Sequence, residues 1–92
     1  GEFALRQNYP NPFNPNTTIN YDIPKDAFVN IIIYDILGRE IKTLVNEKQG
    51  AGFHTQIWDS KDKEGAPVSA GIYLYQIRSE GFIKTHKMIL LK

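Results

Sequence analysis

The 92-residue sequence contains no cysteine, and this absence excludes several kinds of chemistry. Disulfide bonds, a thiol nucleophile and thiolate metal ligands are ruled out, whereas the redox compartment is left open. An excess of charge is also missing, because 11 Lys and Arg stand against 10 Asp and Glu and give a net charge of +1. The basic residues are scattered along the chain rather than gathered in a run, so we expect no binding to nucleic acid.

Long hydrophobic runs are missing too. No stretch approaches the roughly 20 apolar residues that a membrane-spanning helix needs, so no membrane insertion is expected. No secretory signal peptide is recognisable. The first residues, Gly1-Glu2-Phe3, are typical of a cloning remnant. We interpret the chain as a module cut from a longer protein, whose signal peptide would have been lost with the remainder.

The composition is that of one small folded domain. Hydrophobic residues make up 41% of the chain and aromatic residues 12%, which argues against disorder. A chain of this length buries roughly 60–70% of the surface of its unfolded form, which is enough for one thin core. We predict that residues 1–16 form the remnant and a proline-rich lead-in, and that residues 17–92 form a β-sandwich domain.

The most regular stretch runs from Gly71 to Arg78, where the residues alternate between two faces. Tyr73, Tyr75 and Ile77 fall on one face, and a period of two is typical of a β-strand. Because most of the stretch is apolar, we predict a central strand with the other strands packed around it.

Six further segments have strand character, and no segment has the pattern of a helix. Short strands separated by turn residues predict an all-β fold, namely an immunoglobulin-like β-sandwich of about seven antiparallel strands. The remaining strands are expected at residues 17–23, 28–35, 41–45, 53–59, 66–68 and 82–92.

Three connections between these strands are predicted from their turn residues. Residues 36–40 form a turn with Gly38 at positive φ. Residues 46–52 are polar and form a loop, with Glu47 and Lys48 at its solvated tip. Residues 79–81 form a tight hairpin turn.

The strand that contains Trp58 has a conflicting pattern. Burial of Trp58 places Gln56 on the inner face and leaves Ile57 and Phe53 on the other. Either Gln56 lies inside with a hydrogen-bond partner, or a β-bulge shifts the register near Ile57. Both alternatives are open at this point.

The segment before the first strand carries Pro10, Pro12 and Pro15 within six residues. Proline fixes φ and lacks a backbone donor, so this segment is neither a helix nor a central strand. We predict a stiff, extended lead-in, with Tyr9 and Phe13 folded onto the end of the sandwich.

Acidic residues in the polar stretch before Gly65 are weak candidates for a calcium site, because calcium takes several oxygen ligands. These residues are Asp59, Asp62 and Glu64, and turn formation explains them better. The sequence offers no nucleophile elbow and no metal-binding helix motif. A thin core also leaves little room for paired carboxylates in a cleft. We therefore predict a protein that is not an enzyme and that uses no cofactor.

Several short motifs occur in a characteristic order and end with the last residues of the chain. Together they resemble the C-terminal sorting domain of the type IX (Por) secretion system, type A, over residues 5–92. They are also similar to the immunoglobulin-like domain of the flagellar hook-capping protein. The sequence departs from the family at Gln56-Ile57, where an apolar residue usually stands two before the Trp58 position. The matching motifs are Asn8-Tyr9-Pro10-Asn11-Pro12-Phe13-Asn14-Pro15, Thr17-Thr18-Ile19, Ile33-Tyr34-Asp35-Ile36-Leu37-Gly38-Arg39-Glu40, Trp58-Asp59, Gly65-x-Pro67-Val68, Gly71-Ile72-Tyr73-Leu74-Tyr75 and Lys87-Met88-Ile89-Leu90-Leu91-Lys92.

The resemblance implies the last domain of a larger cargo protein of a Bacteroidetes-like bacterium. The cargo would pass through the periplasm to the cell surface or the medium. The partners would be the type IX outer-membrane translocon, which recognises the folded domain, and a sortase-like cysteine protease, which removes it at or before the lead-in. The residues that match the later motifs, and that we predict to serve translocon recognition, are Gly71, Tyr73, Tyr75, Lys87, Met88, Leu90 and Lys92. The residues that match the linker motif are Asn8, Pro10, Asn11, Pro12, Asn14 and Pro15.

A sorting signal that is recognised in the folded state needs a rigid and accessible surface. We expect the last strand to present an open edge, because such edges can be read by strand addition. In this hypothesis Met88 and Leu90 anchor the strand, while Lys87 and Lys92 flank the surface that is recognised.

Two other functions remain alternatives. The first is an accessory module, most plausibly a carbohydrate-binding one attached to a glycosidase, which would present a row of coplanar aromatic side chains such as Tyr34. The second is a structural spacer, which would lie in the interior of its parent chain.

Overall fold

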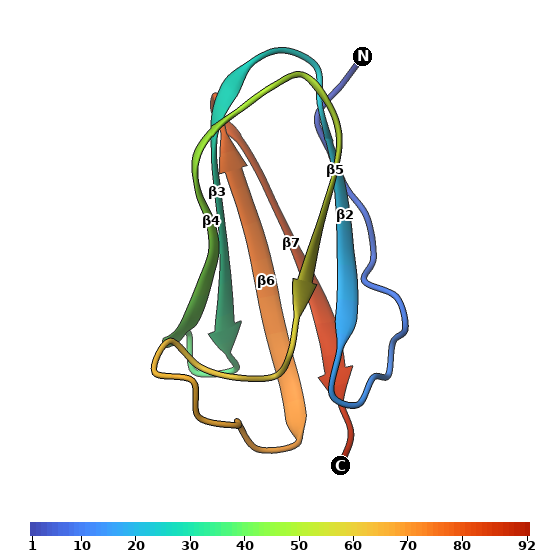
Figure 1. The fold of residues 1–92 in the computed structure, drawn as a ribbon, viewed down its shortest axis with the longest axis vertical. Helices are drawn as coiled ribbons and strands as arrows, with labels where there is room; N and C mark the ends of the chain where they lie inside the picture. Colours follow the sequence, from blue (N-terminus) through green and yellow to red (C-terminus); the bar gives the residue numbers. More distant parts are fainter.

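Seven strands form two stacked antiparallel sheets in the computed structural model, which describes residues 1–92 (Figure 1). The smaller sheet has the strand order β1-β2-β5, and the larger sheet has the order β4-β3-β6-β7. The prediction of an all-β immunoglobulin-like sandwich is confirmed. The strands are β1 (Ala4–Leu5), β2 (Thr17–Ile23), β3 (Ala27–Asp35), β4 (Glu40–Gln49), β5 (Gly52–Trp58), β6 (Gly71–Ser79) and β7 (Phe82–Leu90).

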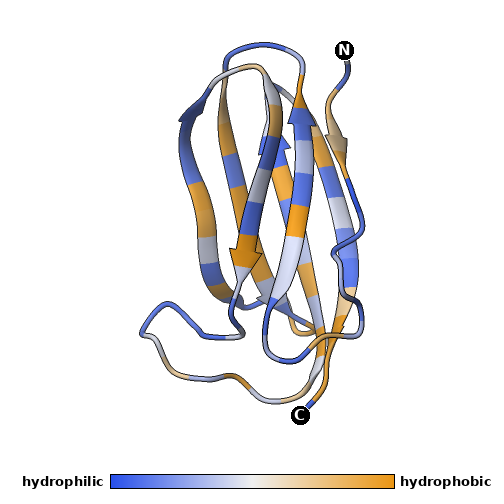
Figure 2. Ribbon diagram, turned by 45° about the vertical axis from the view of Figure 1, so that its right-hand side comes forward, coloured by the Kyte–Doolittle hydropathy of each residue, from blue (hydrophilic) through white to orange (hydrophobic).

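Hydrophobic and hydrophilic residues alternate along the strands (Figure 2), and the buried hydrophobic side chains of both sheets form one core. Strand β6 lies between β3 and β7, and its Tyr73, Tyr75 and Ile77 point inward as predicted. Full burial of an aliphatic or aromatic side chain stabilises the fold by about 1.5–3 kcal/mol. The core consists of Leu5, Phe13, Ile19, Tyr21, Ile23, Val29, Ile31, Ile33, Val45, Trp58, Tyr73, Tyr75, Ile77, Met88 and Leu90.

Three aromatic rings pack together at one end of this core. The ring centroid of Trp58 lies 5.9 Å from that of Phe13 and 5.3 Å from that of Tyr73. Both pairs have the tilted or edge-to-face geometry that aromatic quadrupoles favour. Because the three rings come from the lead-in, β5 and β6, this contact joins the lead-in to both sheets.

The lead-in lies against the sandwich, but its two aromatic residues differ. Phe13 is buried as predicted, whereas Tyr9 is 77% exposed, so the prediction for Tyr9 is wrong. The reason is a backbone pairing, in which Tyr9 and Thr18 exchange two hydrogen bonds of 3.0 and 2.9 Å. Paired residues of antiparallel strands point to the same face, so the Tyr9 side chain follows that of Thr18 outward.

Strand β4 is longer than its composition indicates. The predicted loop at residues 46–52 is wrong, because β4 continues to Gln49 and Glu47 pairs with Val29 of β3. The apolar strand β3 supplies a hydrogen-bonded partner, and this tertiary context outweighs the low strand propensity of a polar segment. Two register shifts along the β3–β4 ladder each leave one extra residue in β4, as at a β-bulge.

Two other predicted strands also differ from the structure. The final strand stops at Leu90 rather than at Lys92, because Leu91 bonds to the lead-in instead of to β6. Residues 66–68 do not form a strand and contribute only an isolated bridge between Lys61 and Pro67. Proline lacks the donor that a longer ladder would need.

Strand β5 resolves the open question about Gln56. The β2–β5 register runs without a bulge from Thr17 opposite Trp58 to Ile23 opposite Gly52. The Gln56 side chain is therefore on the inner face, where it is half-buried, and Ile57 on the outer face is 63% exposed. Burial raises the pKa of Tyr21, and the polar side chains of Gln56 and Gln49, the second of which accepts a hydrogen bond from the Tyr21 hydroxyl, oppose this rise.

The turns adopt the geometries that their residues favour. Gly38 has φ of +82°, as predicted for the turn after β3. In the β6–β7 hairpin, Glu80 and Gly81 both have positive φ, at 50° and 82°. Two such residues form the tight turn that matches the twist of the flanking strands.

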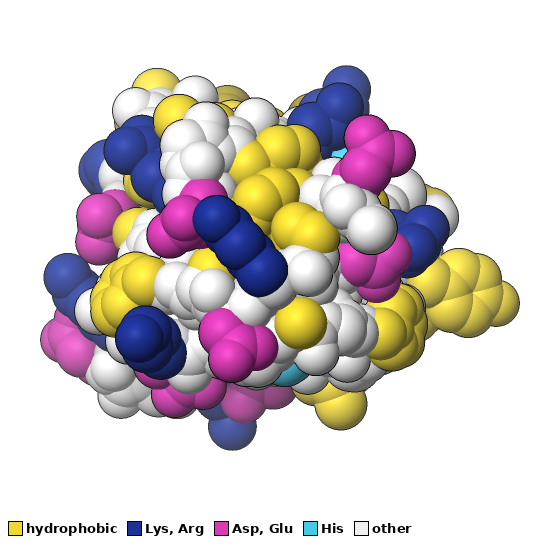
Figure 3. All heavy atoms as spheres, turned by 90° about the horizontal axis from the view of Figure 1, so that it is seen from above, with side chains coloured by type: hydrophobic (Ala, Val, Ile, Leu, Met, Phe, Trp, Pro, Cys, Tyr) yellow, Lys and Arg dark blue, Asp and Glu magenta, His cyan; other side chains and the backbone are white.

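Charges of both signs are spread over the surface. Viewed from the end that carries the β6–β7 turn, acidic, basic and apolar side chains alternate without a large patch of one sign (Figure 3). The structure contains no helix with the length and hydrophobicity of a membrane span.

Candidate functional site

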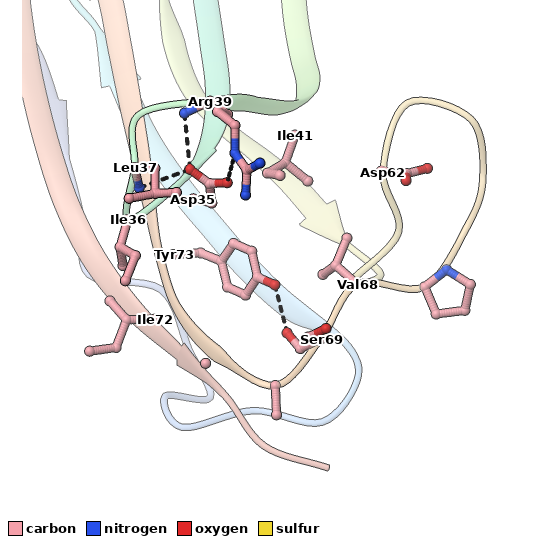
Figure 4. Close-up of a pocket in the computed structure, with 13 residues that line it drawn as sticks. Asp35, Ile36, Leu37, Arg39, Ile41, Asp62, Val68, Ser69, Ile72 and Tyr73 are labelled. Atoms are coloured by element: carbon pink, nitrogen blue, oxygen red, sulfur yellow. Dashed lines mark hydrogen bonds and ion pairs between the residues drawn. The ribbon is translucent and has the colours of Figure 1, made fainter.

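A groove of about 600 Å³ opens at the end of the sandwich where the chain leaves β3 and enters β6 (Figure 4). One wall is the turn that follows β3, and the other is the segment that leads into β6. Both walls come from motifs that the sequence analysis identified. The lining residues are Asp35, Ile36, Leu37, Arg39, Ile41, Asp62, Pro67, Val68, Ser69, Ala70, Gly71, Ile72 and Tyr73.

Asp35 organises the first wall. Its Oδ1 accepts hydrogen bonds from the backbone N–H groups of Leu37 and Arg39, both at 2.9 Å. Its Oδ2 accepts a charge-assisted bond of 2.7 Å from Arg39 Nε. The backbone bond from Arg39 is the main cause that lowers the pKa of Asp35 below its usual value. The turn is therefore held by an ionised carboxylate at neutral pH.

Tyr73 fixes the second wall. Its hydroxyl donates a hydrogen bond of 2.6 Å to the carbonyl of Ser69, and its ring packs edge-on against Trp58. Burial is the main cause that raises the pKa of Tyr73, and the charge of Asp35 adds to this effect. Gly71 has φ of +150°, which a residue with a Cβ rarely adopts. Both walls of the groove are thus fixed by specific contacts.

Apolar side chains form a rim beside this groove. Ile36 and Leu37 are 68% and 75% exposed, and Ile72 and Ile89 are 43% and 36% exposed. Ile72 and Ile89 are direct partners in the β6–β7 ladder. We call these four residues the apolar rim. Exposed apolar side chains that gather in one place, rather than singly, are typical of interaction surfaces.

The edge of β7 next to the rim is closed by the lead-in. Asn11 Oδ1 accepts a bond of 3.0 Å from the Ile89 N–H. Phe13 donates to the Ile89 carbonyl at 3.0 Å and accepts from the Leu91 N–H at 2.8 Å. The expectation of an open edge along the last strand is therefore wrong for this half of β7, because the lead-in already occupies its backbone groups.

The residues that resemble translocon-recognition positions divide into two groups. Gly71 and Tyr73 line the groove, and the side chains of Lys87 and Lys92 are exposed. The side chains of Tyr75, Met88 and Leu90 are at most 1% exposed. In the folded domain these three can support a surface but cannot form it.

The linker-motif residues mainly tie the lead-in to the sandwich. The backbone N–H of Asn8 donates to the Tyr75 hydroxyl at 2.7 Å, and that hydroxyl donates to the Arg6 carbonyl at 2.7 Å. Asn8 Nδ2 donates to Thr17 Oγ1 at 2.9 Å, and Thr17 Oγ1 donates to the Pro10 carbonyl at 2.8 Å. The Pro15 carbonyl accepts a bond from Ser60 Oγ, whereas the Pro12 and Asn14 side chains are exposed.

The weak metal candidates do not come together. No group of three or more acidic or histidine side chains in the structure is arranged to hold a metal ion. Asp62 Oδ1 accepts the backbone N–H groups of Glu64 and Ala66, at 2.9 and 3.0 Å, and Asp59 Oδ1 accepts that of Lys61 at 3.2 Å. These bonds are those of turns, which is the alternative that the sequence favoured.

Sequence reasoning missed the role of Asp35 and the closure of β7 by Asn11. A signal for Asp35 was available, since an Asp three residues before a Gly that needs positive φ is typical of a turn held by side-chain capping. The contact of Asn11 with Ile89 joins residues 78 positions apart, and no local pattern predicts it.

The fold and the match to known sequences define the class of this protein. The two sheets and their strand order are those of an immunoglobulin-like β-sandwich. Residues 14–81 match the family described as the FlgD Ig-like domain, and the chain belongs to that family. None of the curated proteins compared with the chain matches it.

Solved structures share this fold. Dimeric latent PorU from Porphyromonas gingivalis aligns with 99% of this chain at 24% identity and a TM-score of 0.76. FlgD from P. aeruginosa aligns with 80% of the chain at 23% identity and a TM-score of 0.63. PorZ from P. gingivalis, described as an essential bacterial surface component of the type IX secretion system, aligns with 98% at 17% identity and a TM-score of 0.63. The chain spans 10% of PorU, 58% of FlgD and 11% of PorZ.

Proposed function

We propose that this domain is a C-terminal sorting signal that directs a larger cargo protein through the type IX secretion system. In this proposal the translocon in the outer membrane recognises the folded domain, and the cargo reaches the cell surface or the medium through the periplasm. The domain itself performs no catalysis and needs no cofactor. The ordered motifs in the sequence and the shared fold with PorU and PorZ support this proposal.

The observation that carries the proposal lies outside the match to the FlgD family. That match covers residues 14–81, whereas the alignments with PorU and PorZ extend over almost the whole chain. The segments outside the FlgD match are the lead-in and β7, and Asn11 and Phe13 bond them to each other. The family match thus leaves out the two ends of the chain, which the bonds of Asn11 and Phe13 join to each other.

The groove and the apolar rim are the surface that we assign to translocon recognition. They are rigid, because Asp35 and Tyr73 fix the two walls. They combine the exposed apolar side chains of the rim with the charged groove residues Asp35, Arg39 and Asp62. Protein–protein interfaces usually combine apolar and polar surface in this way.

The packing of the lead-in bears on where a sortase-like cysteine protease would cut. Leu5 is buried in the core, and its carbonyl accepts a bond of 2.7 Å from His86 Nε2. A protease needs an extended and accessible segment. We therefore place the cleavage point before Leu5. The division of the chain at residue 16 remains a prediction, although Leu5, Asn8 and Phe13 all pack with the sandwich.

An export assay tests this proposal. Residues 5–92 are fused to the C-terminus of a periplasmic reporter in a bacterium with an intact type IX system and in a translocon mutant. We expect the reporter outside the first strain and in the periplasm of the second. Retention in the periplasm of both, with the domain folded, would contradict the sorting function.

Matched substitutions then test the recognition surface. Ile36→Lys places a charge in the apolar rim, and Ile83→Lys places the same charge on the outer face of β7, at the far end of the sheet. Both side chains are more than half exposed, at 68% and 56%, so we expect both variants to fold. Export should fail only for Ile36→Lys, and equal export of the two would remove the rim from the proposal.

The carbohydrate-binding alternative has less support than the sorting function. Its coplanar aromatic row would require exposed rings on one face. The exposed aromatic side chains are Tyr9, Phe28 and Phe53, of which Phe28 lies on the larger sheet while Phe53 and the segment of Tyr9 lie on the smaller one.

A further inference from the structure

The two sheets have four edges, and three of them are partly covered or carry charged residues. A sheet edge leaves backbone N–H and C=O groups unpaired, and folded proteins usually cover or charge such edges. At β1, the Leu5 carbonyl is occupied by His86, and at β7 the lead-in occupies Ile89 and Leu91. At β4, Lys63 donates to the Ile41 carbonyl at 3.0 Å. Strand β4 also has two register shifts and carries Glu40, Lys42, Glu47 and Lys48.

The fourth edge, along β5, has none of these protections. The strand contains no charged residue and no proline. Phe53 and Ile57 are 64% and 63% exposed. None of the 11 backbone hydrogen bonds outside the ladders reaches Phe53, Thr55 or Ile57.

The register shows which backbone groups of β5 point to solvent. On β2, Thr18 and Asn20 bond to the lead-in, through Tyr9 and Arg6. Backbone groups alternate between the two sides of a strand, so Ile19 and Tyr21 bond to β5. Their partners on β5 are Gln56 and His54. The N–H and C=O groups of the residues between these partners, namely Phe53, Thr55 and Ile57, therefore face outward.

We propose that this edge pairs with the same edge of a second copy of the chain, with Thr55 on a two-fold axis. In this antiparallel arrangement Phe53 faces Ile57 of the second copy, and the reverse pair occurs on the other side of the axis. Roughly six backbone hydrogen bonds would form, two for each facing pair. The two smaller sheets would join into one continuous sheet with β5 of each copy at its centre.

The side chains of β5 are suited to pairing with a second copy of the same strand. Pairs of an aromatic and a β-branched residue, and Thr opposite Thr, are favourable across antiparallel strands. The two-fold axis produces both kinds of pair from a single sequence. A charged partner strand would find no opposite charge on β5, whereas an identical uncharged strand leaves no charge unpaired.

Sedimentation equilibrium of residues 1–92 tests this proposal. We expect the average mass to rise from 10.5 kDa toward twice that value between micromolar and millimolar concentration. Over the same range the backbone N–H groups of Phe53, Thr55 and Ile57 should become protected from hydrogen exchange. A monomer at millimolar concentration, or protection at β4 instead of β5, would overturn the proposal.

Substitutions test the register. Thr55→Lys places like charges beside each other on the axis and should weaken the dimer roughly tenfold or more. The pair of changes F53K and I57E brings opposite charges together across the axis, whereas F53K with I57K brings like charges together. Both double variants lose the same apolar pair, so the first should dimerise more strongly than the second at low salt.

A matched control separates this effect from net charge. F28K with I83K adds the same charge as F53K with I57K, but on the outer face of the larger sheet, where both side chains are about equally exposed, at 52% and 56%. This control should dimerise like the unmodified chain. Equal weakening by the two charge-matched variants would contradict pairing through β5.

Discussion

At the scale of single residues, the Tyr75 hydroxyl connects the lead-in to the core. It accepts from the Asn8 N–H and donates to the Arg6 carbonyl, and the side chain is fully buried. Tyr75→Phe would leave both backbone groups unpaired, so we expect a loss of about 1–3 kcal/mol in the free energy of unfolding. Urea denaturation measures this loss. Tyr34→Phe on the outer face of β3 is the control and should change the free energy of unfolding much less.

The same residue gives the domain a dependence on high pH. Burial raises the pKa of Tyr75 to about 12 in the folded state, against about 10 in an unfolded chain. The neutral hydroxyl therefore contributes stability that is complete below pH 10 and is lost as the pH rises toward 12. Tyr75→Phe should lose less stability over this interval than the unmodified domain. An identical pH slope in both would contradict this assignment. The variant should keep a smaller loss of stability at high pH, because the pKa values of Tyr21 and Tyr73 are also raised.

Asp35 should make the stability of the domain depend on low pH, in the opposite sense to Tyr75. Its pKa is lowered in the folded state, chiefly by the Arg39 backbone N–H. Its contribution to stability is therefore present above its unfolded value, about 4, and is lost as the pH falls through the lower folded value. Asp35→Asn keeps an acceptor oxygen but removes the charge, so the variant should have a lower Tm at pH 7 and should approach the unmodified domain in acid. Thermal melts followed by circular dichroism check this, with Asp59→Asn as the control.

At the scale of elements, the lead-in packs against the sandwich. Phe13 is 2% exposed and packs against Trp58. Phe13→Ala should cost about 3–5 kcal/mol, the usual range for removing a buried aromatic ring. Phe28→Ala removes the same atoms from a side chain that is 52% exposed and should cost far less. Similar midpoints in urea for the two variants would show that the lead-in does not stabilise the core.

The elements that the sequence predicted well are those with a strict period of two. The inner faces of β2, β3 and β6 follow from Ile19, Val29 and Tyr73 and their alternate neighbours, because burial on one face fixes both the strand and its orientation. The extent of β4 could not be predicted, since its polar second half is a strand only because β3 lies beside it.

The candidate site was predictable only in part, for a related reason. Its walls come from recognisable motifs around Gly38 and Gly71, and each motif suggests a turn or a strand by itself. Their meeting in one groove depends on the β3–β6 pairing, in which Asp35 stands opposite Tyr73. The closure of the β7 edge depends on a contact between the two ends of the chain, which local patterns do not encode.

At the scale of the whole molecule, the two ends of the chain depend on each other. Removing residues 87–92 would take Met88 and Leu90 out of the core. It would also remove Ile89 and Leu91, to which Asn11 and Phe13 of the lead-in are hydrogen-bonded. Each buried aliphatic residue contributes about 1.5–3 kcal/mol, and small domains have only about 5–15 kcal/mol of stability in total. We therefore expect this truncation to abolish cooperative unfolding, and a failure of export in that variant would report on folding rather than on recognition.

Removing only Leu91 and Lys92 separates the two effects. This shorter truncation deletes one hydrogen bond, from Leu91 to the Phe13 carbonyl, and two exposed side chains. The expected cost is about 0.5–1.5 kcal/mol, so the domain should remain folded with a slightly lower Tm by circular dichroism. Loss of export by this folded variant would place Leu91 and Lys92 in the recognised surface, whereas full export would restrict that surface to the groove, the apolar rim and Lys87. A molten spectrum for the shorter truncation would contradict the structural argument, because no core residue is removed.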